Sequence, residues 1–294
     1  MNALKEKVIK SILSITAFAS IAFLIGIVVT LFANSLTALK GIDQIQFLFS
    51  SDWAPYYSPA EYGILSMVIS SALIGITAAL VCIPLGIGTA LYLNEIAGSA
   101  QRKILKPVIE ILAGIPSIIF GFFAMAVLAP FLQNIFDLPS GLCILTASLT
   151  LGIMTIPVIT SIAEDALGFV PIGFKEASYA LGGNRWQTLI KVTIPAAASG
   201  IITSIILAIG RIVGETMIVL MVAGGSLAIP TSILAPARPM TSTIAAEMGE
   251  AAYGSLHFSA LFEIGLLLFF MTFILNFISE RISKKYRLKL GQGR

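Results

Sequence analysis

Long apolar runs dominate this sequence and limit the folds that are open to it. Six stretches of about 20 or more residues are almost free of charge, and only 11% of all residues are charged, against about 25% in soluble domains. A helix of roughly 20 apolar residues crosses a bilayer and satisfies its own backbone groups. We therefore predict an all-α, polytopic membrane protein with six transmembrane helices, at about 8–32, 63–93, 108–132, 142–163, 196–223 and 259–278.

The first apolar run is too long for a signal peptide, whose apolar centre has roughly 7–15 residues, so we expect a retained helix. The polar connection that follows is rich in aromatic residues, which suit a membrane interface. We divide the chain into an N-terminal helix with a first periplasmic loop (1–62), a transmembrane core (63–280) and a basic cytoplasmic tail (281–294). Within the core, residues 164–195 are expected to hold a short cytoplasmic helix.

The basic residues predict the orientation of the spans. With both termini in the cytoplasm, the cytoplasmic segments contain 15 of the 18 lysines and arginines. Only Lys40, Arg211 and Arg238 lie elsewhere. Because cytoplasmic loops carry an excess of basic residues, this count favours two cytoplasmic termini and an even number of spans.

A polar island of small residues separates the fourth and fifth apolar runs. Glu176, Ala177 and Ser178 begin it, and they predict a short helix with little side-chain bulk that can lie close to another protein. Gly182 is expected to end that helix, because glycine adopts the left-handed cap without a Cβ clash. Pro195 suits the first turn of the next helix, where a missing N–H costs little.

Two charged residues fall near the middle of the predicted fifth span. Arg211 and Glu215 are four apart, so on a continuous helix they share one face. Charged residues inside a membrane usually face a bundle interior or a pathway, and the guanidinium fork suits a tetrahedral oxyanion. The alternative is a structural ion pair that only fixes helix packing.

Gly114-Ile115-Pro116-Ser117 interrupts the predicted third span. Pro116 removes a hydrogen-bond donor, and a half-helix that begins at Ser117 presents free N–H groups at its positive end. Broken transmembrane helices mark substrate sites in transporters, so we place Pro116 and Ser117 in a substrate pathway. A simple packing kink is the alternative.

The sequence contains no signature of catalysis. It has no G-x4-G-K-[ST] motif for ATP, and no nucleophile triad, metal cluster or paired carboxylates. Cys82 and Cys143 lie in apolar runs and read as buried hydrophobic residues. The lone His257 is interpreted as an interfacial residue without a role. We expect a conduit rather than an enzyme.

Four motifs together resemble those of one transporter family. The island matches the coupling loop of ATP-binding-cassette (ABC) importer permeases, E-A-A-x3-G-x9-I-x-L-P, with Ser, Val and Ile at positions 178, 192 and 194. GRIVGETMIVLMVAGG (210–225), RPMTSTIAAEMGEA (238–251) and GIPSIIFGFF (114–123) are similar to segments of phosphate-importer permeases, and the second favours the PstC type of subunit. The motifs cover most of the chain after residue 63, and the residues before it carry none.

The resemblance implies a type I (MetI-like) ABC importer permease in a prokaryotic plasma (inner) membrane. Its partners would be a PstA-type sister permease, two copies of a cytoplasmic ATPase and an external phosphate-binding protein, with no nucleic acid. The ATPase would bind ATP and Mg, so no cofactor is expected in this chain. The alternatives are an importer of another oxyanion or small solute, or a membrane scaffold or sensor for phosphate signalling.

Overall fold

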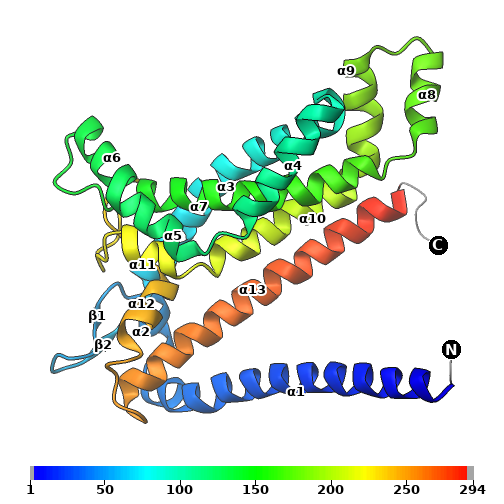
Figure 1. The fold of residues 1–294 in the computed structure, drawn as a ribbon. Coiled ribbons are helices and arrows are strands. Elements are labelled where there is room, and N and C mark those ends of the chain that lie inside the picture. The colour runs from blue at the N-terminus through cyan, green and yellow to red at the C-terminus, as the bar shows by residue number, and fades with distance from the viewer. Residues whose placement is uncertain (1–2, 290–294) are drawn as a thin grey trace.

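The computed structural model describes residues 3–289 of the chain. Within that range six helices are long and apolar enough to cross a membrane, which confirms the predicted all-α, polytopic fold (Figure 1). One antiparallel hairpin, β1 (Trp53–Ala54) with β2 (Glu61–Tyr62), accompanies them. The helices, with π-helical segments labelled η, follow in the order α1 (Ala3–Gly41), α2 (Gln44–Phe49), α3 (Leu65–Leu91), η1 (Tyr92–Ile96), α4 (Ser99–Ala113), α5 (Ser117–Phe123), η2 (Ala124–Leu128), α6 (Ala129–Phe136), α7 (Ile144–Gly168), α8 (Ile172–Ala180), α9 (Arg185–Thr188), η3 (Leu189–Thr193), α10 (Ile194–Val213), α11 (Met217–Val222), α12 (Met240–Glu247) and α13 (Leu256–Lys289).

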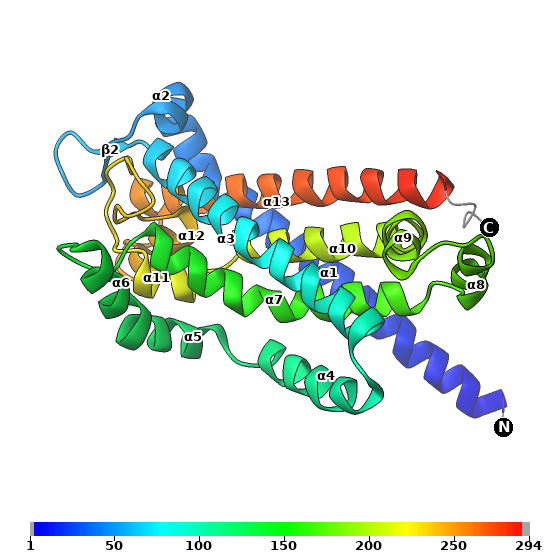
Figure 2. The ribbon, with the colours of Figure 1, turned by 90° about the horizontal axis from the view of Figure 1, so that it is seen from above.

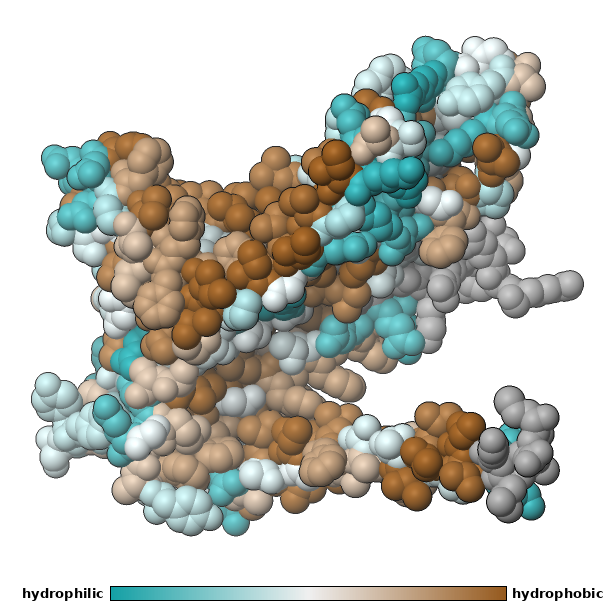
Figure 3. Space-filling view, in the orientation of Figure 1, coloured by the Kyte–Doolittle hydropathy of each residue, from teal (hydrophilic) through white to brown (hydrophobic). Residues whose placement is uncertain are grey.

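The long helices run between two ends of the molecule. We call the end that carries β1 and β2 the hairpin end, and the end that carries α8 and α9 the coupling end (Figure 1). The start of α1 and the end of α13 both lie at the coupling end in the two ribbon views (Figure 2). Hydrophobic residues cover most of the middle of the molecule, and hydrophilic ones gather mainly toward its ends (Figure 3). A bundle that crosses a bilayer requires this distribution.

Helix α7 forms the centre of the bundle, packed against α3 and α10. In the most apolar 18 residues of α7, 67% of the residues are buried. The corresponding share is 22–33% in the second, third, fifth and sixth spans, and it is zero in α1. Glycines let α3 approach closely: a Cβ at Gly86 would lie 2.7 Å from the Cβ of Ile159. Thr160 Oγ1 then donates to the Gly86 carbonyl at 3.2 Å. Ser148 Oγ of α7 likewise donates to the Ile74 carbonyl at 3.3 Å, so small residues and two hydroxyls hold the two helices together.

Helix α1 contacts the rest of the chain mainly near the hairpin end, where Phe32 meets Phe270 of α13 edge to face at 5.9 Å. Toward the coupling end the two helices diverge (Figures 1 and 2). Most of the apolar side chains of α1 are consequently exposed, including Phe18 and Phe23. In a bilayer these side chains face lipid or another subunit.

The third span differs from its prediction of 108–132, because the helical segment that precedes it is separate. Residues 94–107, expected to be a short turn, instead end η1 and form most of the amphipathic helix α4. Helix α4 stops at Ala113, and the spanning helix runs from Ser117 to Phe136. Pro116 has an extended backbone (φ −58°, ψ 138°), which interrupts the helix there.

The fifth span was predicted as one helix over 196–223 and is in fact broken. The long helix begins earlier, at Arg185, because Asn184 and Gln187 form a reciprocal capping box. It ends at Val213, with Gly214 as its cap, and α11 begins at Met217. The helical ladder is therefore interrupted at residues 214–216, between Arg211 and the apolar helix that follows.

The predicted orientation is testable because both native cysteines, Cys82 and Cys143, are buried and should not react. Asp137, exposed at the end of α6, and Lys103, exposed on α4, lie near opposite ends of the bundle. We expect a membrane-impermeant maleimide to label Asp137→Cys in intact cells, but Lys103→Cys only after permeabilisation. Equal labelling of both variants in intact cells would contradict two cytoplasmic termini.

Candidate substrate pathway and coupling surface

The loop between the fourth and fifth spans forms a helical hairpin at the coupling end. Helix α8 ends as predicted at Gly182, whose φ of +81° is a left-handed conformation. Its N–H donates to the Tyr179 carbonyl at 2.9 Å, and the next N–H, of Gly183, donates to the Ser178 carbonyl at 2.9 Å. Ser178 Oγ also lies 2.8 Å from Thr188 Oγ1, which joins α8 to α9. The turn is therefore fixed by local bonds.

Pro195 is the second residue of α10, in agreement with its predicted place in a first turn. The helix that contains it is nevertheless continuous from Arg185, through the π-helical segment η3. The Ile194 N–H reaches back five residues to the Leu189 carbonyl. The wider π-helical turn lies just before Pro195, which has no N–H to donate. This turn accommodates the proline without ending the helix.

The outer surface of this hairpin exposes large apolar side chains. Glu176 and Ala177 are exposed on α8. Around them Leu181 is 90% exposed and Trp186 63% exposed. A shallow cavity of about 460 Å³ lies beside them, lined by residues that include Phe174 and Lys191. Exposed apolar surface of this kind makes the hairpin a candidate surface for a protein contact.

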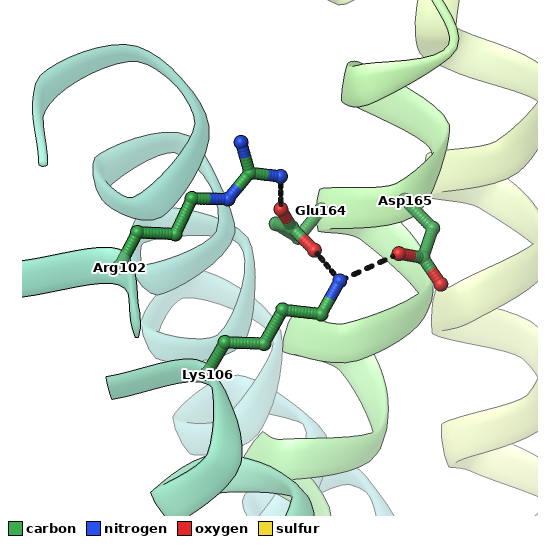
Figure 4. Close-up of polar contacts among 4 residues, drawn as sticks. All are labelled: Arg102, Lys106, Glu164 and Asp165. Atoms are coloured by element: carbon green, nitrogen blue, oxygen red, sulfur yellow. Dashed lines mark hydrogen bonds and ion pairs between the residues drawn. The ribbon is translucent and has the colours of Figure 1, made fainter. Parts of the chain in front are cut away.

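Ion pairs fix the neighbouring helix ends, and the predicted site did not include them. Glu164, almost fully buried on α7, pairs with Arg102 and with Lys106, the latter at 2.7 Å, and Asp165 pairs with Lys106 at 3.0 Å (Figure 4). The hydrogen bond to Glu164, followed by that to Asp165, raises the pKa of Lys106, so this lysine stays charged at neutral pH.

A second ion pair connects the coupling hairpin itself to the core. Lys175 of α8 pairs with Glu95 of η1, at the end of the α3 span, and both side chains are largely buried. Our orientation argument counted only basic residues. The acidic residues at the ends of the second and fourth spans are the sequence signal that would have revealed these pairs.

The structure does not bring Arg211 and Glu215 together as an ion pair. Arg211 lies in the last turn of α10, whereas Glu215 lies in the break beyond it, so the two do not share one helix face. The Glu215 carboxylate instead accepts from the N–H groups of Met217 and Ile218, at 3.1 and 3.3 Å. Among the described residues no ion pair or hydrogen bond to the Arg211 guanidinium is found.

The breaks in the third and fifth spans lie close together. Helices α5 and α11 pack side by side, and a Cβ at Gly121 would lie 2.7 Å from Met221 Sδ and 3.7 Å from Ile218 Cα. Both helices run toward the hairpin end, as Figure 2 shows. Their first residues, Ser117 and Met217, therefore lie at similar depth, and Pro116 precedes the start of α5 as predicted.

A third helix, α12, begins at the same place. Thr241 Oγ1 donates to the Glu215 carbonyl at 2.8 Å, and the Met240 N–H donates to Ser71 Oγ at 3.1 Å. Ser71 lies six residues inside α3, about 9 Å from the hairpin end at 1.5 Å per residue. Arg211 lies deeper than this, because its neighbour Ile212 comes within 3.9 Å of a Cβ built at Gly75, ten residues inside α3. Three helix starts, each with N–H groups that lack intrahelical acceptors, gather around the break at residues 214–216, beyond Arg211.

His257 does not have the idle interfacial position predicted for it. It is 7% exposed, and its Nε2 lies 2.9 Å from Oε2 of Glu247. No group of His, Cys, Asp and Glu residues suited to a metal ion is found in the part of the chain that the structure describes.

Comparisons with known proteins agree with this geometry. A family model described as "Binding-protein-dependent transport system inner membrane component" matches residues 82–288. The chain is 36% identical to a probable ABC transporter permease protein, YqgH, of Bacillus subtilis, over 93% of this chain and 90% of that protein. It is 35% identical to the phosphate transport system permease protein PstC of Mesorhizobium japonicum, over 98% of this chain and 93% of that one.

Solved structures share the fold. An alginate ABC transporter chain has a TM-score of 0.69 at 14% identity, covering 96% of this chain and 95% of that chain. A chain of the MetNI methionine ABC transporter has a TM-score of 0.56 at 22% identity, covering 76% and 94%. The fold and the family match thus define a multi-pass permease component of an ABC importer, a transport component whose ATPase is a separate chain. The chain belongs to the family of binding-protein-dependent transport system inner membrane components.

Gly182 gives a direct test of the coupling surface. A β-branched side chain in the left-handed region costs at least roughly 1–2 kcal/mol and shifts the turn between α8 and α9. We expect Gly182→Val to assemble in the membrane but to lose transport and transport-stimulated ATP hydrolysis, both measured on the reconstituted complex.

Gly98 provides the matched control. It precedes α4 with φ −67°, and a Cβ there meets nothing within 4 Å, so Gly98→Val should transport normally. Normal transport by Gly182→Val would show that this segment is an ordinary loop.

Proposed function

We propose that the chain is a permease subunit of an ATP-driven importer of inorganic phosphate and forms half of its transmembrane pathway. The hairpin end would face outward and both termini the cytoplasm, in a prokaryotic plasma membrane. The coupling loop around Glu176, Ala177, Ser178, Gly182 and Pro195 would dock on a cytoplasmic ATPase, which binds ATP and Mg. The other partners would be a PstA-type sister permease, a second ATPase copy and an external phosphate-binding protein.

The observation that carries the proposal is the surroundings of Arg211. A guanidinium inside a membrane helix costs up to about 2.5–3.5 kcal/mol on insertion scales, so it is retained for a contact that it makes. Glu215 does not neutralise it, because that carboxylate caps α11. An unpaired guanidinium four residues before the break at which the starts of α11 and α12 meet suits an anion with several oxygen atoms, which accepts bonds from both kinds of donor.

The phosphate itself is supported by the relatives. The PstC proteins of Mesorhizobium japonicum and Methanocaldococcus jannaschii, the latter named as probable, are 35% and 32% identical to this chain over most of its length. The site proposed for the anion comprises Arg211, Pro116 and Ser117. Glu215 would act on it indirectly, because it holds the start of α11 and keeps a negative charge near the path, which helps a conduit to release its anion.

Arg211 is the residue whose replacement separates a ligand from a packing role. We expect Arg211→Gln to leave the complex intact and reduce uptake of radiolabelled phosphate to background in proteoliposomes, because the anion loses its charged ligand. Arg211→Lys should keep part of the activity, since the charge remains but the two parallel bonds do not. The charge swap Arg211→Glu with Glu215→Arg should not restore uptake, because the two side chains are not paired.

The outcomes separate the alternatives. Uptake of sulfate but not of phosphate by the wild-type complex would favour another oxyanion importer. A wild-type complex that assembles but transports neither anion would favour a scaffold or sensor. Full phosphate uptake by Arg211→Gln, or recovery in the swap, would refute the anion-ligand role.

A further inference from the structure

A groove opens at the hairpin end between β1, β2 and the loop that follows α11. Its volume is about 610 Å³, and its lining combines two carboxylates, Asp52 and Glu61, with apolar side chains that include Leu227 and Ile229. Both carboxylates are exposed and neither takes part in an ion pair of the described chain. Tyr57, at the tip of the hairpin, is 77% exposed. The groove thus offers negative charge and apolar surface together.

The wider surface at this end is also acidic. Five exposed carboxylates and a single exposed lysine lie on the segments that connect the long helices there, namely Asp43, Asp52, Glu61, Asp137, Glu250 and Lys40. The remaining basic residue of this end, Arg238, is paired with Glu247 at 2.9 Å. A protein that approaches this end therefore meets a field that attracts positive charge.

The hairpin of β1 and β2, which forms one wall of the groove, is fixed by buried contacts to Glu247 and His257. Trp53 is buried, and its indole N–H donates to Glu247 Oε2 at 2.9 Å. The same carboxylate contacts His257 at 2.9 Å and Arg238 at 2.9 Å. The rings of Trp53 and Tyr56 both lie edge to face against His257, with centroids 5.9 and 5.0 Å away. A wall fixed in this way is preorganised to receive a partner.

Glu247 also connects the groove to the helix breaks. It is the last residue of α12, and the first two residues of the same helix, Met240 and Thr241, bond to Ser71 and to the Glu215 carbonyl. Helix α12 has eight residues, so it is a rigid strut of about 12 Å. Helix α12 thus joins the hairpin, through Glu247, to the start of α11, through the Glu215 carbonyl.

We propose that this groove is where the external solute-binding protein of the importer docks, through a segment that carries Lys or Arg, and that α12 relays docking to the helix breaks. The inference rests on the proposed function for the existence of that partner and for the outward orientation. It does not depend on the solute, since docking involves surfaces of the two proteins and not the transported anion.

Crosslinking in intact cells identifies the occupant. A photoreactive amino acid in place of Tyr57 should capture a solute-binding protein, identified by mass spectrometry, whereas one in place of Leu181 at the coupling end should capture the ATPase. Capture at position 57 of membrane subunits alone would overturn the docking proposal. Because the captured protein is identified whatever its solute, an error about phosphate would appear separately, in the uptake assay.

Charge reversal tests the chemistry of the groove. We expect the double variant Asp52→Lys with Glu61→Lys to weaken binding of the purified binding protein to the intact complex at least roughly tenfold at low salt, and less at high salt. Asp43→Lys with Glu250→Lys reverses the same number of charges outside the groove and should weaken binding by less than about threefold. Equal effects of the two pairs, or no effect of the first, would overturn the proposal.

Thr241→Val tests the relay, because it removes the hydroxyl bond to the Glu215 carbonyl and leaves the groove intact. We expect the binding protein to bind this variant as it binds the wild type, but to stimulate ATP hydrolysis less than half as much. Wild-type stimulation would overturn the relay. The matched control is Thr37→Val, an exposed threonine of α1 near the same end, which should preserve both binding and stimulation.

Discussion

The need to satisfy backbone polar groups inside a bilayer governs this structure, since an unpaired N–H or carbonyl in hydrocarbon costs several kcal/mol. Unbroken helices meet this need by themselves, but the third and fifth spans are interrupted. The fifth is repaired from both sides: Glu215 accepts from two N–H groups at the start of α11, and Thr241 donates to the Glu215 carbonyl. The first N–H groups of α7 are also satisfied from outside the helix, because they donate to the carbonyls of Ile233 and Ala235.

These repairs determine where function can reside. A break tolerated at membrane depth must be buried in protein or line a cavity. Here two breaks and the start of α12 meet, and one guanidinium stands beside them without a counter-ion in the described chain. The N-terminal ends of helices carry partial positive charge, and the arginine adds a full one. Together they produce a positive potential, which favours an anion. At the coupling end the charged groups form ion pairs instead. Those of Lys175, Arg102 and Lys106 fix the helix ends around the loop that we assign to the ATPase.

Sequence patterns predicted the features that depend on local chemistry. Three spans, the second, fourth and sixth, lie within about five residues of their predicted ends, because hydropathy over 20 residues decides them. The left-handed conformation of Gly182 and the helix start at Ser117 also follow from the nature of glycine and proline. Predictions failed where a break or a distant contact decided the outcome. The pairing of Arg211 with Glu215 assumed a continuous helix, and Gly214 ends it.

Contacts between residues far apart in the chain could not be predicted from sequence patterns. Trp53 and Glu247 are 194 residues apart, and no spacing rule relates them. His257 therefore read as an idle interfacial residue, although it belongs to the same buried cluster. Glu164 is similar: its partners lie 58 and 62 residues earlier in a segment that we expected to be a turn, and only the packing of α4 on α7 brings them together.

The central claim is that the helix starts beside Arg211 form an anion site. The most direct measurement is a cryo-electron microscopy structure of the whole importer, assembled with its partner subunits and trapped in phosphate. The account predicts anion density in contact with the Arg211 guanidinium and the backbone N–H groups at the start of α5 or α12. Density that places Arg211 in a salt bridge with a protein carboxylate, with the anion bound elsewhere along the pathway, would contradict it.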